Sequence, residues 1–142
     1  MDKKIFFKLE VVNNYPPVDE ESLWAKELQN GLFEIDNIPF YTKEVSLGDL
    51  VSTVRKDDVL YFKKVEKNSA NNTLRVIFLR SDEFVVTVSQ YLTQLGCEIE
   101  KFSEKFMALS VDNLDVLASV LEYLELMSEQ GILDYETGKL NL

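Results

Sequence analysis

The sequence contains no histidine and a single cysteine, Cys97, and these two shortages exclude much of the chemistry of enzymes and metal sites. Without histidine there can be no Ser-His or Cys-His nucleophile pair, and the commonest general base and zinc ligand are missing. One cysteine cannot form an internal disulfide or a multi-cysteine metal site. We therefore expect no enzymatic activity, no cofactor and no metal, and a protein that works by binding.

Long hydrophobic stretches are also missing. No window approaches the roughly 20 apolar residues that a membrane-spanning helix needs. The N-terminal segment Met1–Val12 alternates apolar and charged residues and lacks the apolar core and cleavage site of a signal peptide. Cys97 follows Gly96 at the start of an alternating segment, so we interpret it as a small apolar strand residue. These features predict a cytoplasmic protein.

Positive charge is scarce, with 15 lysines and arginines against 25 acidic residues and a formal net charge of −10. Nucleic-acid binders normally show the opposite balance, because lysine and arginine neutralise phosphates. Anionic membrane surfaces are disfavoured for the same reason. We expect neither partner, and a basic protein is the partner that fits the sign of the charge. An acidic composition that merely keeps the protein soluble is the alternative.

Residues 1–70 alternate between apolar and polar side chains, which predicts a small antiparallel β unit resembling a partly closed barrel. Residues 2–12 form the first predicted strand. Asn30-Gly31 between two alternating runs is a strong hairpin signal, and Arg55-Lys56-Asp57-Asp58 joins two further strand-like runs. We interpret Trp24 as a core residue of this unit, with a role as an interface anchor as the alternative.

Residues 71–142 predict a different unit, in which two helices alternate with four strands. Leu74–Leu79 is almost continuously apolar, as expected for a strand buried on both faces. Ser81 is a predicted helix N-cap, and Gly96 stands where a helix C-cap is expected. The other predicted elements are strands Cys97–Phe102 and Phe106–Val111, a helix from about Asp112 to Gln130, and a strand from Leu133 to Leu140 with a bend at Thr137-Gly138. This order is typical of the ferredoxin-like split βαβ arrangement, so the whole chain is predicted to be an α+β protein whose two units pack as one module.

Acidic residues are concentrated in the second unit and on its last helix. Residues 1–72 contain 10 basic and 13 acidic residues, whereas residues 73–142 contain 5 and 12. Asp115, Glu122, Glu125 and Glu129 recur at steps of seven, three and four, which places them on one helical stripe opposite the apolar one. No lysine or arginine lies three or four residues away to pair with them. We hypothesise that this stripe binds a basic partner, and an ordinary solvated helix face is the alternative.

A second acidic cluster, Asp19-Glu20-Glu21, follows a Pro-Pro turn and precedes the only tryptophan. It is the second candidate for partner binding. Paired carboxylates could also support acid–base catalysis, and Asp57-Asp58 or Asp36 with Asp49 are available for it. Adjacent aspartates are usually turn formers, however, and no nucleophile or phosphate-binding glycine loop accompanies them.

Several motifs together resemble a bacterial protein family of unknown function. They are Glu21-Ser22-Leu23-Trp24-Ala25, Asp36-Asn37-Ile38-Pro39-Phe40 and Val45-Ser46-Leu47-Gly48-Asp49, and similar motifs continue into the second unit. The resemblance covers most of the chain. It implies one integrated unit of about this length in the bacterial cytosol, and it implies no activity.

Small size, strong acidity and the lack of catalytic residues lead to one main functional hypothesis. The protein is expected to be an immunity-type inhibitor that binds and neutralises a basic bacterial toxin, such as a nuclease. A module that binds a small ligand or has a regulatory role is the alternative, because ferredoxin-like units often bind metabolites. An enzyme ranks third.

Overall fold

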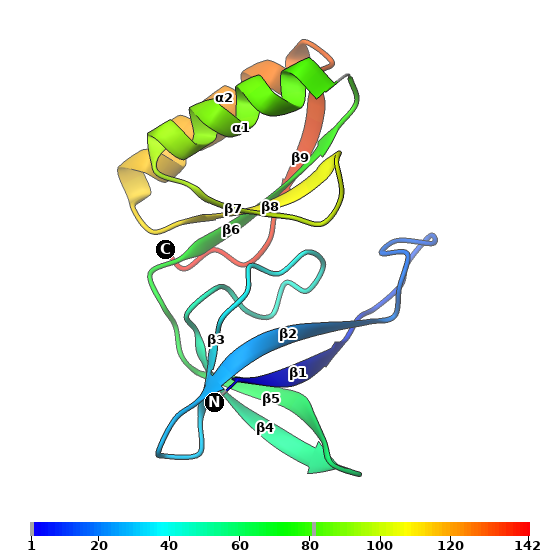
Figure 1. Cartoon of the computed structure of the whole chain (residues 1–142), viewed down its shortest axis with the longest axis vertical. Coiled ribbons are helices and arrows are strands. Elements are labelled where there is room, and N and C mark those ends of the chain that lie inside the picture. Colours follow the sequence, from blue (N-terminus) through cyan, green and yellow to red (C-terminus); the bar gives the residue numbers. More distant parts are fainter. Residues whose placement is uncertain (1, 81) are drawn as a thin grey trace.

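Two β units follow one another along the chain, a closed barrel and a four-stranded sheet that carries two helices on one face (Figure 1). The computed structural model describes residues 2–80 and 82–142. Its elements are β1 (Asp2–Lys8), β2 (Glu20–Glu27), β3 (Phe33–Ile35), β4 (Leu50–Lys56), β5 (Val59–Lys67), β6 (Asn72–Phe78), α1 (Asp82–Leu95), β7 (Glu98–Lys101), β8 (Phe106–Val111), α2 (Leu114–Glu129) and β9 (Leu133–Thr137).

The barrel follows the strand order β1-β2-β3-β4-β5 and confirms the predicted barrel-like unit. Each strand pairs with the next one in antiparallel orientation. The barrel is closed by β1 and β5, which pair in parallel. The predicted hairpin at Asn30-Gly31 joins β2 to β3, and Gly31 takes the positive φ (83°) that favours glycine. The buried side chains inside the barrel are Ile5, Phe7, Leu23, Ala25, Phe33, Ile35, Val45, Val51 and Leu60.

The connection between β1 and β2 is a long arm, residues 9–19, that projects from the barrel (Figure 1). The predicted first strand, 2–12, is therefore too long, because β1 ends at Lys8. The arm is a narrow hairpin closed by backbone hydrogen bonds between Val12 and Tyr15, with Asn13-Asn14 at its tip. Val11, Val12 and Tyr15 are exposed, since the arm has no opposite layer against which to pack.

The four-stranded sheet follows the order β7-β8-β6-β9 with every neighbouring pair antiparallel, which is the split βαβ order predicted from the sequence. Both α1 and α2 cover the same face (Figure 1). On that face Leu74, Val76 and Phe78 of the central strand β6 pack in a core with residues of both helices, such as Leu92 and Leu124. Neither helix is long and apolar enough to cross a membrane within the part of the chain described here.

The helix boundaries follow local signals. Asn113 caps α2, because its side-chain oxygen accepts hydrogen bonds from the backbone N–H groups of Asp115 and Val116 at 2.9 and 3.0 Å. Gly96 ends α1 with a φ of 113°, as expected for a C-cap glycine. The predicted N-cap, Ser81, lies outside the described residues.

The predicted strand 133–140 is shorter than expected, because β9 ends at Thr137, at the predicted bend, although the backbones of Gly138 and Lys139 still bond to Thr73 of β6. Another sequence-based expectation is wrong. Trp24 is not a core residue, since its side chain is 46% exposed. Its neighbours Leu23 and Ala25 point into the barrel, so the alternation along β2 turns Trp24 outward. There the Lys4 ammonium lies 5.1 Å from the centre of the Trp24 ring.

Candidate functional site

Buried polar side chains gather on the face of the sheet that points away from the helices. Because side chains alternate along a strand, Arg75 and Ile77 of β6 lie on this face, next to Phe106 and Ala108 of β8. Glu136 of β9 lies beside Arg75 on the other side. The burial of nearly every residue of β6 confirms the expectation that this strand is covered on both faces.

The long loop between β3 and β4, residues 36–49, covers much of this face and lies between the sheet and the barrel (Figure 1). Two carboxylates hold it. Glu100 of β7 accepts hydrogen bonds from the Ile38 backbone N–H at 2.8 Å and from the Asn37 side chain at 3.3 Å. From the barrel side, Glu21 accepts three backbone N–H groups, those of residues 40, 41 and 42, at 2.7, 3.2 and 2.8 Å. The loop is therefore fixed to both units.

A buried ion pair closes the other end of the loop. The Asp49 side chain is fully buried and lies 2.7 Å from the Lys139 ammonium, which follows β9. Asp49 also accepts the backbone N–H groups of Ser46 and Ser69 and the side-chain amide of Asn141, at 2.9, 2.8 and 3.0 Å. With four donors, this carboxylate is well compensated for its loss of water.

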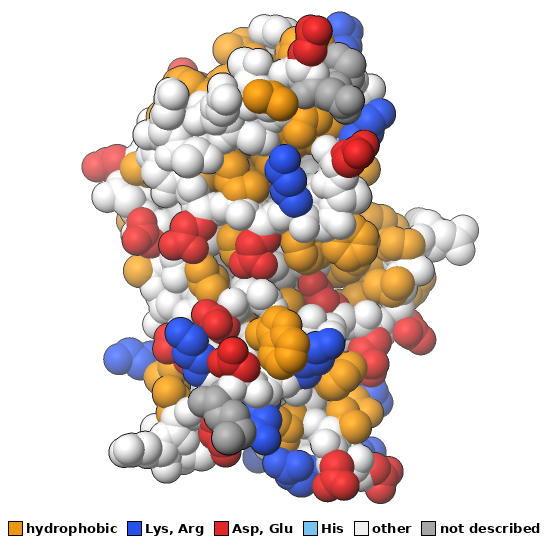
Figure 2. Space-filling view, viewed as in Figure 1, with side chains coloured by type: hydrophobic (Ala, Val, Ile, Leu, Met, Phe, Trp, Pro, Cys, Tyr) orange, Lys and Arg blue, Asp and Glu red, His pale blue; other side chains and the backbone are white. Residues whose placement is uncertain are grey.

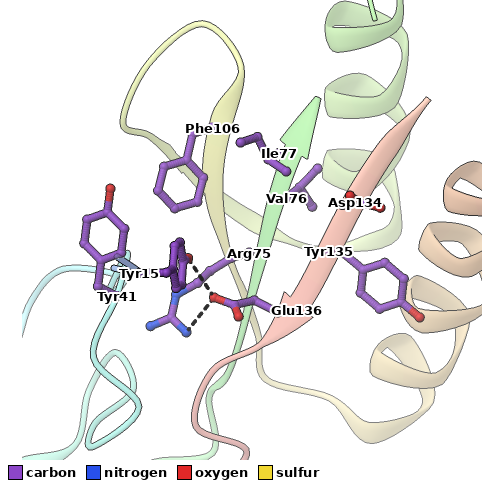
Figure 3. Close-up of a pocket in the computed structure, with 9 residues that line it drawn as sticks. All are labelled: Tyr15, Tyr41, Arg75, Val76, Ile77, Phe106, Asp134, Tyr135 and Glu136. Carbon is purple, nitrogen blue, oxygen red and sulfur yellow. Dashed lines mark hydrogen bonds and ion pairs between the residues drawn. The ribbon is translucent and has the colours of Figure 1, made fainter. Parts of the chain in front are cut away.

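A pocket of about 300 Å³ remains where the loop leaves the sheet face uncovered (Figure 3). It lies between the strands β6, β8 and β9, the loop, and the arm that reaches up from the barrel. Hydrophobic side chains also gather on the right-hand flank of the molecular surface, where the arm meets the upper unit (Figure 2). The residues that line the pocket are Tyr15, Tyr41, Arg75, Val76, Ile77, Phe106, Asp134, Tyr135 and Glu136.

Arg75 lies at the bottom of this pocket, and its side chain is 1% exposed. One terminal nitrogen, Nη2, donates to the backbone carbonyl of Thr42, and the other, Nη1, lies 3.8 Å from the Glu136 carboxylate. Among the described residues no acceptor lies within hydrogen-bond distance of Nε or Nη1. Burial lowers the pKa of Arg75, while Glu136 and Glu21 act in the opposite direction. A guanidinium normally stays charged even when buried, so this is a cation with two unused donors.

Two tyrosines form the wall opposite β9. The Tyr15 hydroxyl donates to Glu136 at 3.3 Å, and Figure 3 shows the Tyr15 ring standing close to the guanidinium. Tyr41 packs edge-on against Tyr15 and also contacts Phe106, with ring centres 6.2 and 5.6 Å apart. Burial is the main cause that raises the pKa of both tyrosines, so both hydroxyls are protonated and can donate near neutral pH. The site thus combines flat apolar walls with fixed donors and a carboxylate acceptor.

The acidic stripe predicted on the last helix is present on the outer face of α2. Asp115, Glu122, Glu125 and Glu129 are all exposed. Glu125 accepts a hydrogen bond of 2.5 Å from the Tyr135 hydroxyl, and Leu126 is half-exposed between the acidic side chains. Neither α1 nor α2 contains a lysine or arginine. The helical layer therefore presents carboxylates and an apolar side chain, and the Arg80 guanidinium lies at its edge, 3.5 Å from the Gln130 carbonyl at the end of α2.

The second acidic cluster is divided by the fold. Asp19 and Glu20 are exposed at the start of β2, but the Glu21 carboxylate is occupied by the three N–H groups of the loop. Glu21 therefore stabilises the structure, and only its two neighbours are open to a partner. Figure 1 shows β2 in the lower half and α2 at the top, so the structure does not bring the two acidic sets together.

The carboxylates considered for catalysis lie in a turn and in two different ion pairs. Asp57 and Asp58 form the tight turn between β4 and β5, both with positive φ. Asp36 lies 3.9 Å from Lys26 on the barrel, whereas Asp49 is paired with Lys139. In residues 2–80 and 82–142 no group of three His, Cys, Asp or Glu side chains is placed to hold a metal ion.

Sequence reasoning missed the pocket, whose chemical groups are Arg75, Glu136, Tyr15 and Tyr41. One signal for it was available. Arg75 is the only charged residue in the apolar run Leu74–Leu79, and a strand predicted to be buried on both faces must bury that charge as well. The two tyrosines come from an arm and a loop, whose positions local patterns do not predict.

Comparison with known proteins places the chain in a family. The model described as "Domain of unknown function (DUF4265)" matches residues 21–135, so the chain belongs to this family, and the resemblance noted in the motifs is confirmed. A search of curated proteins found no match. The chain is similar to a solved structure described as "Novel crystal structure of a hypothetical protein from Neisseria gonorrhoeae", with a TM-score of 0.83 and 22% identity over 100% of this chain and 97% of that one. At this identity the likeness shows the fold alone.

Proposed function

We propose that this protein is a non-catalytic binding protein that captures a basic protein partner on the outer face of α2. An immunity-type inhibitor that neutralises a basic bacterial toxin, such as a nuclease, would work in this way. The observation that carries the proposal is the exposed carboxylate stripe, Asp115, Glu122, Glu125 and Glu129, on a helical layer without lysine or arginine.

Electrostatics supports such a role. A surface of one sign on a protein of net charge −10 attracts a cationic partner and accelerates association by roughly 10- to 1000-fold. The same field disfavours nucleic acids and anionic membranes. Leu126, half-exposed among the carboxylates, provides an apolar contact of the kind found at the centre of protein interfaces. Asp19 and Glu20 are the next surface to consider, because they too are exposed.

The cytoplasm is the proposed site of action. The protein has one cysteine, Cys97, and burial raises the pKa of its thiol to about 11. Such a thiol is protonated and unreactive at neutral pH, and it needs no oxidising compartment.

Co-expression with the product of the adjacent open reading frame of the source genome tests the proposal. We expect the two proteins to co-purify and the toxicity of the partner to disappear. If the partner neither co-purifies nor loses toxicity, the inhibitor function is wrong.

Charge reversal then tests the binding face. Glu122→Lys with Glu129→Lys avoids Glu125, whose carboxylate bonds to Tyr135. We expect this pair to slow association at least tenfold at low ionic strength with little change in thermal stability. Asp2→Lys with Glu27→Lys makes the same change in net charge on exposed barrel positions and is the matched control. Equal slowing by both pairs would mean that net charge, not the α2 face, governs binding.

Binding of a small ligand, with or without a regulatory role, is the second candidate function. A different observation favours it, namely a pocket with aromatic walls and a buried cation that has two unused donors. A concave, largely apolar pocket with a few fixed polar groups is the usual form of a small-molecule site.

A further inference from the structure

We infer that the pocket above Arg75 binds a small neutral aromatic amide, that is, a flat ring bearing a carbonyl oxygen beside an N–H group. This inference goes beyond the inhibitor function and rests on the second candidate function. Four features of the pocket lead to it, and each specifies one property of the ligand.

The unused donors of Arg75 specify the carbonyl oxygen. Nε and Nη1 are buried and have no acceptor within hydrogen-bond distance among the described residues, whereas the other strongly buried ionic group, Asp49, has four donors. A buried donor without a partner costs about 1–3 kcal/mol. A ligand oxygen that accepts from Nε or Nη1 recovers part of that cost, so the pocket favours a molecule with a strong neutral acceptor.

The Glu136 carboxylate specifies the N–H group. Among the described residues, its Oε1 atom accepts one hydrogen bond, from the Tyr15 hydroxyl, and that bond is long (3.3 Å) and exposed. Its other oxygen lies 4.0 Å from the exposed Lys43 ammonium. Tyr15 is itself 51% exposed on the projecting arm, so its side chain can turn away with little loss of packing. The ligand N–H takes the place of the tyrosine hydroxyl, and the same movement opens the way to the guanidinium beside it (Figure 3).

The walls specify the ring. Once Tyr15 has turned away, Tyr41 and Phe106 present aromatic surfaces, and Ile77, which is 48% exposed, adds an apolar floor. A volume of about 300 Å³ lies at the lower end of the usual range for ligand pockets, which suits one ring and its substituent. Offset or edge-on contacts with such rings are each worth about 0.5–1.5 kcal/mol beyond the area they bury.

The charges around the pocket specify a neutral ligand. A carboxylate on the ligand would face Glu136 and the exposed Asp134, and a cationic group would face Arg75. Like charges at such short range disfavour binding of both ions. An amide presents the acceptor to Arg75 and the donor to Glu136 without carrying charge.

Three probes of nearly the same shape separate these requirements. Benzamide has the acceptor and the donor, benzoate has acceptors and a negative charge, and benzamidine has donors and a positive charge. We expect benzamide to bind at least tenfold more tightly than either ion in a titration followed by amide chemical shifts, with the largest changes at Ile77, Phe106 and Glu136. Tighter binding of benzoate or benzamidine would overturn the ligand class, and no change in the pocket signals with any probe would overturn the site.

A variant that fills the pocket completes the test, because Arg75 variants would also lose the contact with Thr42. Ile77→Trp places a large ring on an exposed position of the pocket floor and should weaken benzamide binding at least tenfold at an unchanged melting temperature. Leu79→Trp is the matched control, since Leu79 is 53% exposed near the same end of β6 but does not line the pocket. Unchanged binding to Ile77→Trp would place the site elsewhere. Neither variant touches α2, so the outcome is independent of the inhibitor proposal.

Discussion

The two faces of the four-stranded sheet are held by different physical means. On one face, apolar side chains of β6 such as Leu74 and Val76 pack against α1 and α2. On the other, carboxylates fix a long loop, as Glu100 and Asp49 accept hydrogen bonds from residues far away in the sequence. The first face depends on shape and hydrophobic burial, whereas the second depends on the completeness of its hydrogen bonds.

This difference explains why the candidate pocket lies on the polar face. Apolar packing fills its space, because the side chains of the helical core are in close contact. Hydrogen-bonded loops hold polar groups in fixed positions without filling all the space around them. Two nitrogens of Arg75 and the Ser110 hydroxyl are the buried side-chain groups without a hydrogen-bond partner in the described part of the chain, and all of them lie on that face.

Removal of the Asp49 carboxylate is expected to have the largest effect on stability, and it directly tests whether the polar face depends on its hydrogen bonds. Asp49→Ala leaves the partly buried Lys139 ammonium without its counter-ion and orphans two backbone N–H groups. We expect a loss of about 3–5 kcal/mol in the free energy of unfolding. Leu124→Ala, on the apolar face, should cost about 3 kcal/mol. Urea denaturation measures both, and an Asp49→Ala loss below that of Leu124→Ala would contradict the importance of the polar contacts.

Glu21 and Glu20 allow a finer test of the polar contacts, because they are neighbouring glutamates, of which only Glu21 accepts hydrogen bonds from the loop among the described residues. Glu21→Ala removes the acceptor for three backbone N–H groups of the loop and should cost about 2 kcal/mol. Glu20→Ala is the matched control on an exposed position and should leave the unfolding curve unchanged. Equal curves for the two variants would show that the loop does not depend on Glu21.

The smallest expected effect is a dependence of stability on pH that arises from Glu100. Burial raises the pKa of this carboxyl above its ordinary value, although the bonds from Ile38 and Asn37 oppose the shift. The folded protein therefore binds this proton more tightly than the unfolded chain does. Glu100 thus contributes most to the free energy of unfolding below the pKa of the unfolded chain, and this contribution is lost as the pH rises through the pKa of the folded protein. Compared with Glu100→Gln, the wild type should lose stability as the pH rises above the ordinary carboxyl pKa of 4.5. A difference that stays constant over this range would contradict the assignment.

Local patterns predicted the elements of the fold well. The alternation in residues 1–70, the hairpin at Asn30-Gly31 and the glycine after the first helix all reflect preferences of the chain over a few residues. Trp24 shows the limit of this reasoning. Its size suggested the core, but the phase of the alternation along β2, set by Leu23 and Ala25, turns it outward.

The candidate site depended on contacts that no local pattern contains. Glu21 appeared in the sequence as part of an acidic cluster, and its three partners are supplied by a loop about twenty residues further along. Glu136 and Tyr15 are 121 residues apart. The stripe on α2 could be predicted because helix periodicity alone determines which side chains share a face.

The Nε–H resonance of Arg75 in a ¹⁵N-labelled sample tests the contrast between the two faces most directly. In the free protein we expect this signal at the position of a guanidinium N–H without a protein acceptor, and we expect it to move downfield as benzamide is added, because the ligand oxygen then accepts from it. A signal already downfield in the free protein, or one that stays in place at saturating benzamide, would contradict the view that Arg75 is an unsatisfied cation of the polar face that a ligand oxygen completes.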